Sequence, residues 1–368
     1  MIGEVAPVQT LNPPQIDPSR DDDVMSGSAG SARQDESWRR CVERYAQPHL
    51  GRSLWALATS VVPFVALWVS MYFALQVSYL LVVALAIPAA GFLLRTYILF
   101  HDCAHGSFLP TKRANVWLGT ALGLLVFTPY ARWRHEHTVH HATAGDLDRR
   151  GVGDVPTYTV AEYLSWSWPT RVGYRLIRNP AVMFGLGPIY AMLLEPRWAN
   201  PSGAKRIRRT IWATNVALVL LIGGLCWLIG WREFLLVEAL FVPLAGGAGI
   251  WLFYVQHQFD HTYWERGADW SYEDAALRGS SYLKLPKVLQ FFTGNIGLHH
   301  VHHLSAKIPN YHLQRVHDEG AIFRDVPSVS FADGLRAVRL KLWDEEKARL
   351  VTWREVRRGR MRSAALSV

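Results

Sequence analysis

Four long apolar segments constrain the fold of this 368-residue chain more than any other feature. Each reaches the length of about 20 apolar residues that a helix rising about 1.5 Å per residue needs to cross a bilayer. Short links join the first to the second and the third to the fourth, as in two hairpins. The sequence therefore predicts an all-α integral membrane protein with four transmembrane helices, at residues 54–75, 79–100, 210–230 and 234–255.

Basic residues are distributed unevenly around these segments. The two links within the hairpins carry almost no net charge, whereas lysines and arginines gather in residues 101–209, in residues 256–345 and at the C-terminal end. Positive residues mark the cytosolic side of a membrane protein. The net charge of +9 is explained by this orientation and by anionic lipid headgroups, and no nucleic-acid recognition motif accompanies it, so a nucleic-acid partner is not expected.

The rest of the chain divides into shorter segments. Two apolar runs, 116–130 and 181–194, fall below a comfortable spanning length and predict interfacial or re-entrant helices. Residues 1–38 lack the order of a signal peptide and predict a disordered cytosolic tail. Residues 39–345 form the expected single domain, with a cytosolic cap, and 346–368 form a basic tail. The three cysteines are too scattered to indicate a disulfide framework.

Three histidine clusters lie beside the apolar segments, in the sequences HDCAH, HTVHH and HHVHH. Residues three and four apart share one face of a helix, so each cluster can direct its imidazoles to one point. Imidazole suits iron, copper, nickel and zinc, and one zinc site needs at most four ligands. Eight imidazoles therefore indicate two metal ions in an all-nitrogen site. The candidate ligands are His101, His105, His137, His140, His141, His299, His302 and His303.

Other histidines are assigned from their positions. His257 directly follows the fourth apolar segment, at the depth of the first cluster, and is the expected ninth ligand. His135, His261 and His300 lie out of register with the clusters and are expected not to bind metal. Isolated histidines elsewhere are expected to be packing residues.

A metal-binding histidine usually donates its second ring N–H to a carboxylate or carbonyl group, which fixes its tautomer. Asn295, just before the third cluster, is expected to cap its helix or to hold a metal-bound water. Asp148, beside two arginines, is expected to be solvated only. The other candidates for outer partners of the ligands are Asp102, Glu136, Asp146, Asp154 and Asp260.

With these clusters the chain resembles the membrane fatty acid desaturases, the integral-membrane histidine-box family, and within it the bacterial acyl-lipid group labelled omega-6 or delta-12. The resemblance covers about residues 40–345. It includes the motifs FHDC from Phe100, WR from Trp133, GDLDRRG from Gly145, KLPK from Lys284 and GNIGLHHVHHLSAKIPNY from Gly294. Members of this group tend to carry an acidic pair after the histidine that leaves the fourth span, whereas here Asp260 is followed by His261.

The resemblance implies a function. It implies that the nine histidines hold a non-haem diiron centre, which uses dioxygen and two electrons to introduce a cis double bond into an acyl chain. It also implies a bacterial inner membrane with the histidine clusters on the cytosolic side. The sequence contains no HPGG-type haem-binding segment, so the electron donor is expected to be a separate small protein such as a ferredoxin, docking on the basic surface.

Three other interpretations remain open from the sequence. A related histidine-box enzyme could hydroxylate or epoxidise a lipid, since the same oxidant can return oxygen to the substrate. A membrane metal transporter would need ionisable groups along the spans, which offer almost none apart from Glu238. A zinc-dependent membrane hydrolase would leave most of the clustered histidines without a role.

Overall fold

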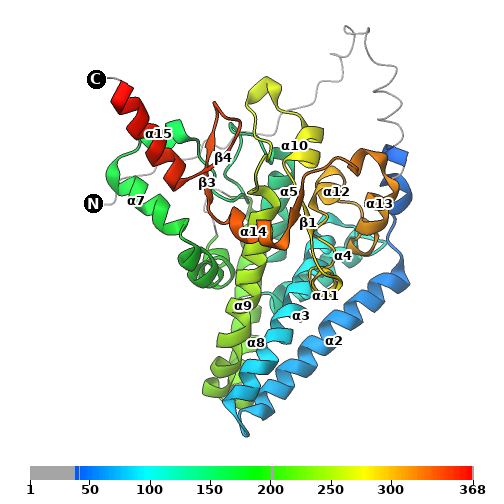
Figure 1. Cartoon of the computed structure of the whole chain (residues 1–368). Helices are drawn as coiled ribbons and strands as arrows, with labels where there is room; N and C mark the ends of the chain where they lie inside the picture. The colour runs from blue at the N-terminus through cyan, green and yellow to red at the C-terminus, as the bar shows by residue number, and fades with distance from the viewer. Residues whose placement is uncertain (1–37, 41, 200–202, 367–368) are drawn as a thin grey trace.

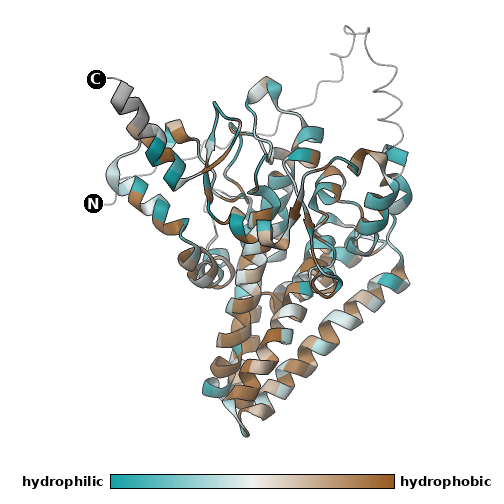
Figure 2. Cartoon of the chain, viewed as in Figure 1, coloured by the Kyte–Doolittle hydropathy of each residue, from teal (hydrophilic) through white to brown (hydrophobic). Residues whose placement is uncertain are grey.

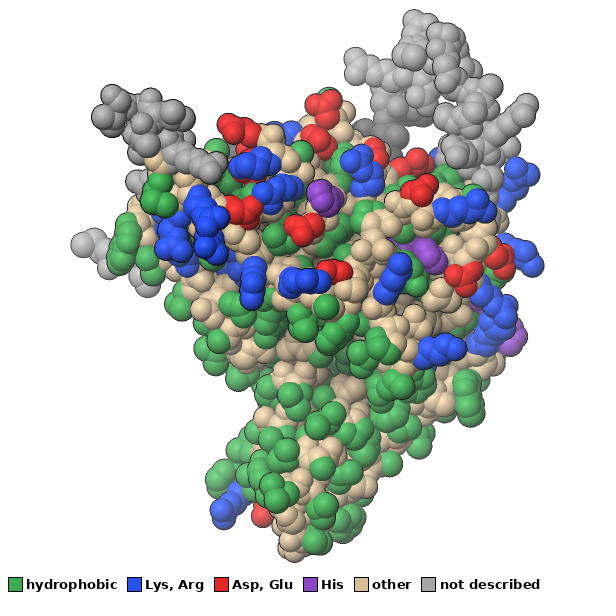
Figure 3. All heavy atoms as spheres, in the orientation of Figure 1, with side chains coloured by type: hydrophobic (Ala, Val, Ile, Leu, Met, Phe, Trp, Pro, Cys, Tyr) green, Lys and Arg blue, Asp and Glu red, His purple; other side chains and the backbone are tan. Residues whose placement is uncertain are grey.

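The computed structural model describes residues 38–40, 42–199 and 203–366, so the expected tail 1–38 lies outside the described residues except for Trp38. A stem of long helices tapers to one end and carries a broad cap of shorter elements at the other (Figure 1). Apolar residues cover the stem, while polar residues concentrate in the cap (Figure 2). On the face seen in the space-filling view, charged side chains gather over the cap, and the narrow part of the stem shows them only at its tip (Figure 3).

The stem confirms the four predicted spans. Its helices are each long and apolar enough to cross a membrane: α2 (Leu50–Ala74), α3 (Tyr79–His105), α8 (Lys205–Ile229) and α9 (Trp231–His257). Helix α3 packs between α2 and α9, and α8 packs on α9. Both α3 and α9 continue without a break beyond their apolar segments into the cap. The first histidine cluster is therefore the last turn of α3, and His257 is the last residue of α9.

The apolar run at 116–130 is not one helix. It is divided between α4 (Lys112–Leu125) and α5 (Tyr130–Thr143), which are bent by 104° relative to each other, as in a broken span or a re-entrant loop. At the break Phe127 has a positive φ of 55°. A side chain on Gly123 would come within 2.6 Å of the Thr128 carbonyl oxygen, so the close turn requires glycine there. The bend directs α5, with the second histidine cluster, into the cap.

The run at 181–194 is helical, as two π-helical stretches, η1 (Val182–Leu186) and η2 (Ile189–Leu194). They follow the amphipathic helix α7 (Trp168–Ile177) and precede the short η3 (Glu195–Arg197). No residue of η1 or η2 is fully buried. Both stretches pack against α9.

A buried arginine holds the end of α7 against α9. Arg178 is 1% exposed and donates hydrogen bonds to the Tyr254 hydroxyl (3.2 Å), the Gln258 side-chain oxygen (3.1 Å) and the Pro156 carbonyl oxygen (3.1 Å). A guanidinium can satisfy several acceptors at once because its donors lie in a fixed plane. This network fixes the loop before α6 (Val160–Ser165) relative to the cap end of α9.

The cap is mainly helical but contains two short sheets that the sequence did not indicate. Strands β1 (Tyr282–Lys284) and β2 (Ser328–Ser330) pair in parallel, and β3 (Leu340–Asp344) and β4 (Arg349–Thr352) form an antiparallel hairpin. The expected boundary between domain and tail, at residue 345, falls in this hairpin. The cap helices are α10 (Tyr272–Arg278), α11 (Lys287–Phe292), α12 (His299–Leu304), α13 (Leu313–Glu319), α14 (Phe331–Ala337) and α15 (Trp353–Leu366).

Helix α12 lies at the centre of the cap. All six of its residues are buried, and it packs against α10, α13 and β1. Its apolar residues Val301 and Leu304 belong to the core that also contains Leu283 of β1. This packing leaves the third histidine cluster facing the ends of α3, α5 and α9.

Candidate metal centre

The structure brings the nine candidate ligands together in two groups. In each group one ring nitrogen per residue can be chosen so that all chosen atoms lie within 4.8 Å of one another. The five-histidine group contains His101, His105, His137, His141 and His302, and the four-histidine group contains His140, His257, His299 and His303.

The two groups share helices. Helix α3 supplies only the five-histidine group and α9 only the four-histidine group, whereas α5 and α12 supply both. Consecutive residues on a helix point about 100° apart, so the neighbours His140 and His141 reach different groups, as do His302 and His303. The groups are adjacent, because the His141 and His303 rings are stacked with centroids 4.1 Å apart.

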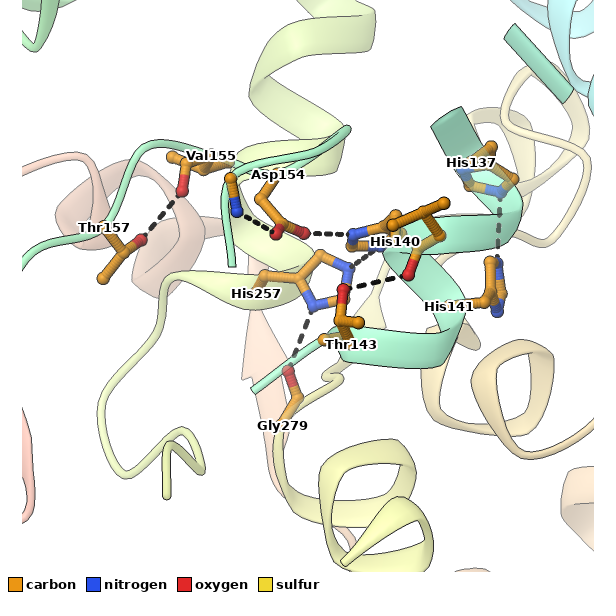
Figure 4. Close-up of polar contacts among 12 residues, drawn as sticks. His137, His140, His141, Thr143, Asp154, Val155, Thr157, His257 and Gly279 are labelled. Atoms are coloured by element: carbon orange, nitrogen blue, oxygen red, sulfur yellow. Dashed lines mark hydrogen bonds and ion pairs between the residues drawn. The ribbon is translucent and has the colours of Figure 1, made fainter. Parts of the chain in front are cut away.

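Hydrogen bonds fix the tautomers of two histidines in the four-histidine group (Figure 4). The Nδ1–H of His140 donates to the Asp154 carboxylate at 2.5 Å, and the Nδ1–H of His257 donates to the Gly279 carbonyl oxygen at 3.2 Å. A neutral imidazole carries one proton, so both Nε2 atoms present lone pairs. These atoms face each other at 3.2 Å without a proton between them. Two lone pairs at that distance repel unless a cation lies between the rings.

Buried ring nitrogens without partners indicate the same chemistry. Nε2 of His105, in the five-histidine group, and Nε2 of His303, in the four-histidine group, are buried and form no hydrogen bond. In the five-histidine group Nε2 of His141 also lies 3.1 Å from Nε2 of His137 and 3.0 Å from that of His302. An unpaired buried polar atom is costly, and coordination of a metal ion would satisfy these atoms. The residues present therefore fit two metal ions.

Burial keeps the third cluster in the form that binds metal. Burial in the cap, reinforced by neighbouring imidazoles, holds the pKa values of His299, His302 and His303 well below the ordinary histidine value. These rings are neutral at physiological pH. Only neutral imidazole can donate a lone pair to a metal, so the site does not have to lose protons before it binds one.

The Asp154–His140 pair provides a test of the outer contacts. Asp154 also accepts a hydrogen bond from the Gly151 amide at 3.0 Å, so an asparagine could replace only part of its bonding. We expect Asp154→Asn to weaken metal binding about 10- to 100-fold, because a charged partner makes the imidazole a stronger ligand. Metal retention against a competing chelator measures this, with folding checked by thermal unfolding. Asp148→Asn is the matched control, because Asp148 is paired with Arg266 at 2.5 Å; equal metal loss in both variants would contradict the prediction.

A second outer network supports the end of α3. The His101 Nδ1 lies 3.1 Å from one oxygen of the buried Asp102 carboxylate. The other oxygen accepts hydrogen bonds from the Asn310 backbone amide (2.9 Å) and side chain (2.7 Å). Asn295 does not contact a ligand and does not cap α12; its side chain donates to the Asn310 carbonyl oxygen at 3.2 Å. Sequence reasoning missed Asn310 because only the folded chain brings residue 310 beside residue 102.

The remaining acidic candidates lie elsewhere. Glu136 accepts a hydrogen bond from Arg132 at 2.8 Å rather than from a ligand. Asp260 is exposed on the turn after α9. Asp146 is buried but accepts hydrogen bonds from the backbone amides of Asp148 (2.8 Å) and Arg149 (3.2 Å), so it organises its own loop.

The three out-of-register histidines lie outside both groups. His135 is exposed on α5, and His261 is exposed with a positive φ of 63°. His300 is buried on the opposite side of α12, where its Nε2 lies 3.0 Å from Nδ1 of His317. The structure thus separates these rings from the nine that converge.

A large cavity reaches both groups. Its volume is about 740 Å³, within the usual range for ligand pockets. His101 and His137 of one group and His299 of the other line it, and Trp133 is stacked on His137 at a centroid distance of 4.3 Å. The remaining walls are mainly apolar. They come from α3, α5, η1, η2 and α9, so the cavity runs from the histidines into the stem.

These features define a class: helical membrane-spanning proteins with a histidine-rich metal site that faces an apolar cavity. Comparisons with known proteins agree. The family model for fatty acid desaturases matches residues 78–325. A fatty acid desaturase of Bacillus subtilis (strain 168) is 46% identical over 86% of this chain and 90% of that protein. The chain belongs to the fatty acid desaturase family, whose activity is that of an oxygen-dependent oxidoreductase.

More distant relatives have more specific names. The chloroplastic omega-6 fatty acid desaturase of Brassica napus is 27% identical over 60% of this chain and 49% of that protein. The sn-1 acyl-lipid omega-3 desaturase (ferredoxin) of Synechocystis is 29% identical over 60% of this chain and 61% of that protein.

Proposed function

We propose that this protein is an acyl-lipid desaturase that introduces a cis double bond into a membrane lipid chain, at a diiron centre held by the nine histidines. The observation that carries the proposal is that histidines of both groups line one apolar cavity continuous with the membrane-spanning helices. A lipid chain matches that cavity because its walls are mainly hydrocarbon. The name of the Synechocystis relative, an acyl-lipid omega-3 desaturase, supports an acyl-lipid substrate. The name of the Brassica napus relative supports an omega-6 bond position.

The proposed reaction converts two adjacent methylene groups, dioxygen, two electrons and two protons into a carbon–carbon double bond and two waters. When bound, the irons would supply the activation of dioxygen and the removal of the two hydrogens. The protein would orient the chain: Trp133 and the apolar residues of α3 and α9 hold it beside the histidines and exclude bulk water. The outer partners Asp102 and Asp154 would keep the imidazoles oriented.

The proposed location is the bacterial inner membrane, with the cap in the cytosol. The distribution of lysines and arginines supports this orientation, because the cap contains most of them. A ferredoxin is the proposed electron donor, supported by the name of the Synechocystis relative and by the positive charge of the cap.

Product analysis tests the proposal. Cells of a host that lacks this activity would express the wild type or His302→Ala, together with a ferredoxin system, and their fatty acid methyl esters would be analysed by gas chromatography and mass spectrometry with derivatisation of double bonds. We expect a new unsaturated acyl species with the wild type alone. Hydroxy or epoxy products would instead assign the chain to the related oxygenases. No new product from the wild type, with the protein in the membrane and the donor active, would contradict the proposal.

A further inference from the structure

Two of the nine histidines are not fully buried. His105 and His141 are partly exposed, whereas the other seven are buried. Neither residue lines the cavity, which touches the histidine groups through His101, His137 and His299. The exposed parts of His105 and His141 therefore lie outside this cavity. Both belong to the five-histidine group, whereas all four residues of the other group are buried.

Two exposed cations flank this place. Lys307 donates a hydrogen bond from Nζ to the His105 carbonyl oxygen at 3.0 Å. Arg134 lies on the same face of α5 as His141, since residues seven apart are two turns apart, and the exposed Thr138 lies between them. The charges of both Lys307 and Arg134 act on the His105 ring. Neither cation forms an ion pair with a carboxylate in the part of the chain that the structure describes.

We propose that the His105–His141 edge, meaning these two histidines with Arg134 and Lys307, is the docking site for a small acidic one-electron carrier. The inference rests on the proposed function, because an oxygen-dependent desaturase must receive two electrons per turnover. Substrate would occupy the cavity, so electrons must enter from another side. At this edge two of the ligand residues are partly exposed, and positive charge without a carboxylate partner lies beside them to attract an acidic partner.

The electron balance sets the sequence of events. Two carrier molecules dock in turn, and each is oxidised by one electron. These two electrons, two protons from water and the two substrate hydrogens reduce one dioxygen to two waters. Because each carrier must leave before the next arrives, a weak interface steered by charge suits the task better than a tight apolar one.

The test compares two electron donors on purified, iron-loaded full-length protein in lipid nanodiscs. One donor is a plant-type [2Fe–2S] ferredoxin kept reduced by its reductase and NADPH, and the other is the methyl viologen radical cation, which a basic docking surface would not attract. We expect Arg134→Glu and Lys307→Glu each to lower the ratio of ferredoxin-driven to viologen-driven desaturation, by about tenfold at low ionic strength. The difference should shrink as salt is added.

Controls separate docking from other effects. Arg324→Glu reverses an exposed charge elsewhere on the cap and should leave the ratio at the wild-type value. Arg134→Glu is the decisive variant, because Lys307 also contacts the His105 backbone. An Arg134→Glu ratio equal to that of Arg324→Glu would overturn the docking inference while leaving desaturation established. Absence of unsaturated product from the wild type with either donor would instead overturn the proposed function.

Discussion

Replacing His302 with alanine is expected to abolish desaturation and to remove metal mainly from the five-histidine group. His302 is 1% exposed, and its Nε2 faces Nε2 of His141 at 3.0 Å. Loss of one imidazole from a buried site leaves neighbouring nitrogens unsatisfied. We expect activity to fall at least about 1,000-fold, since residues that act as one unit cannot replace each other. Iron per folded chain, measured by inductively coupled plasma mass spectrometry, should fall from two towards one.

His303→Ala makes the prediction specific. His303 is the neighbour of His302 on α12 but belongs to the four-histidine group. This variant should therefore lose the other metal, and its activity should fall to a similar extent. His135→Ala is the matched control, because His135 lies on α5 but is exposed and outside both groups. This variant should retain iron and activity. Full iron content in His302→Ala would contradict the assignment of that residue as a ligand.

Replacing Gly249 with leucine is expected to change which acyl chains are accepted. Gly249 of α9 lines the cavity roughly 12 Å from His257 along the helix axis, given a rise of about 1.5 Å per residue. A methyl group there would meet Leu94 of α3 at 3.6 Å, an ordinary contact, so the fold should tolerate a side chain. A leucine would occupy the space between α9 and α3 that an extended chain needs.

The expected result is selective. Desaturation of longer acyl chains should fall about tenfold relative to shorter ones, because a pocket discriminates roughly that strongly for each methylene it cannot accommodate. The readout is competition between acyl chains of different length in one reaction. Gly223→Leu is the control: Gly223 is exposed on α8, and an added Cβ would meet no atom within 4 Å. An equal loss for all chain lengths in Gly249→Leu would contradict the prediction.

Spans and histidine spacing could be predicted from the sequence because each depends on local pattern. A run without charge specifies a membrane helix wherever it occurs, and the three- and four-residue spacing in HTVHH fixes which rings share a face of α5. The position of His257 was predictable for the same reason, since α9 continues straight out of its apolar segment.

Contacts between distant segments could not be predicted in this way. Asp154 and Glu136 are both acidic and both near the second cluster in sequence, yet only Asp154 bonds to His140, because the loop after α5 turns back over the helix. The division of the clusters between two groups also depends on packing. The helical rotation separates His302 from His303, but nothing in HHVHH indicates which group each one joins until α12 is set against α3, α5 and α9. The short strands β1 to β4 have too few residues for a period to be recognised.

The sharing of α5 and α12 between the two groups implies an order of assembly during biosynthesis. Once the first hairpin and α5 have been synthesised, four of the five ligands of the five-histidine group are already in place, but only His140 of the other. The second hairpin must be inserted before His257 is available, and α12 emerges later still. Neither group can be completed until α12 has folded into the cap, so both sets of ligands become complete only after membrane insertion, when the last helix that carries ligands joins them.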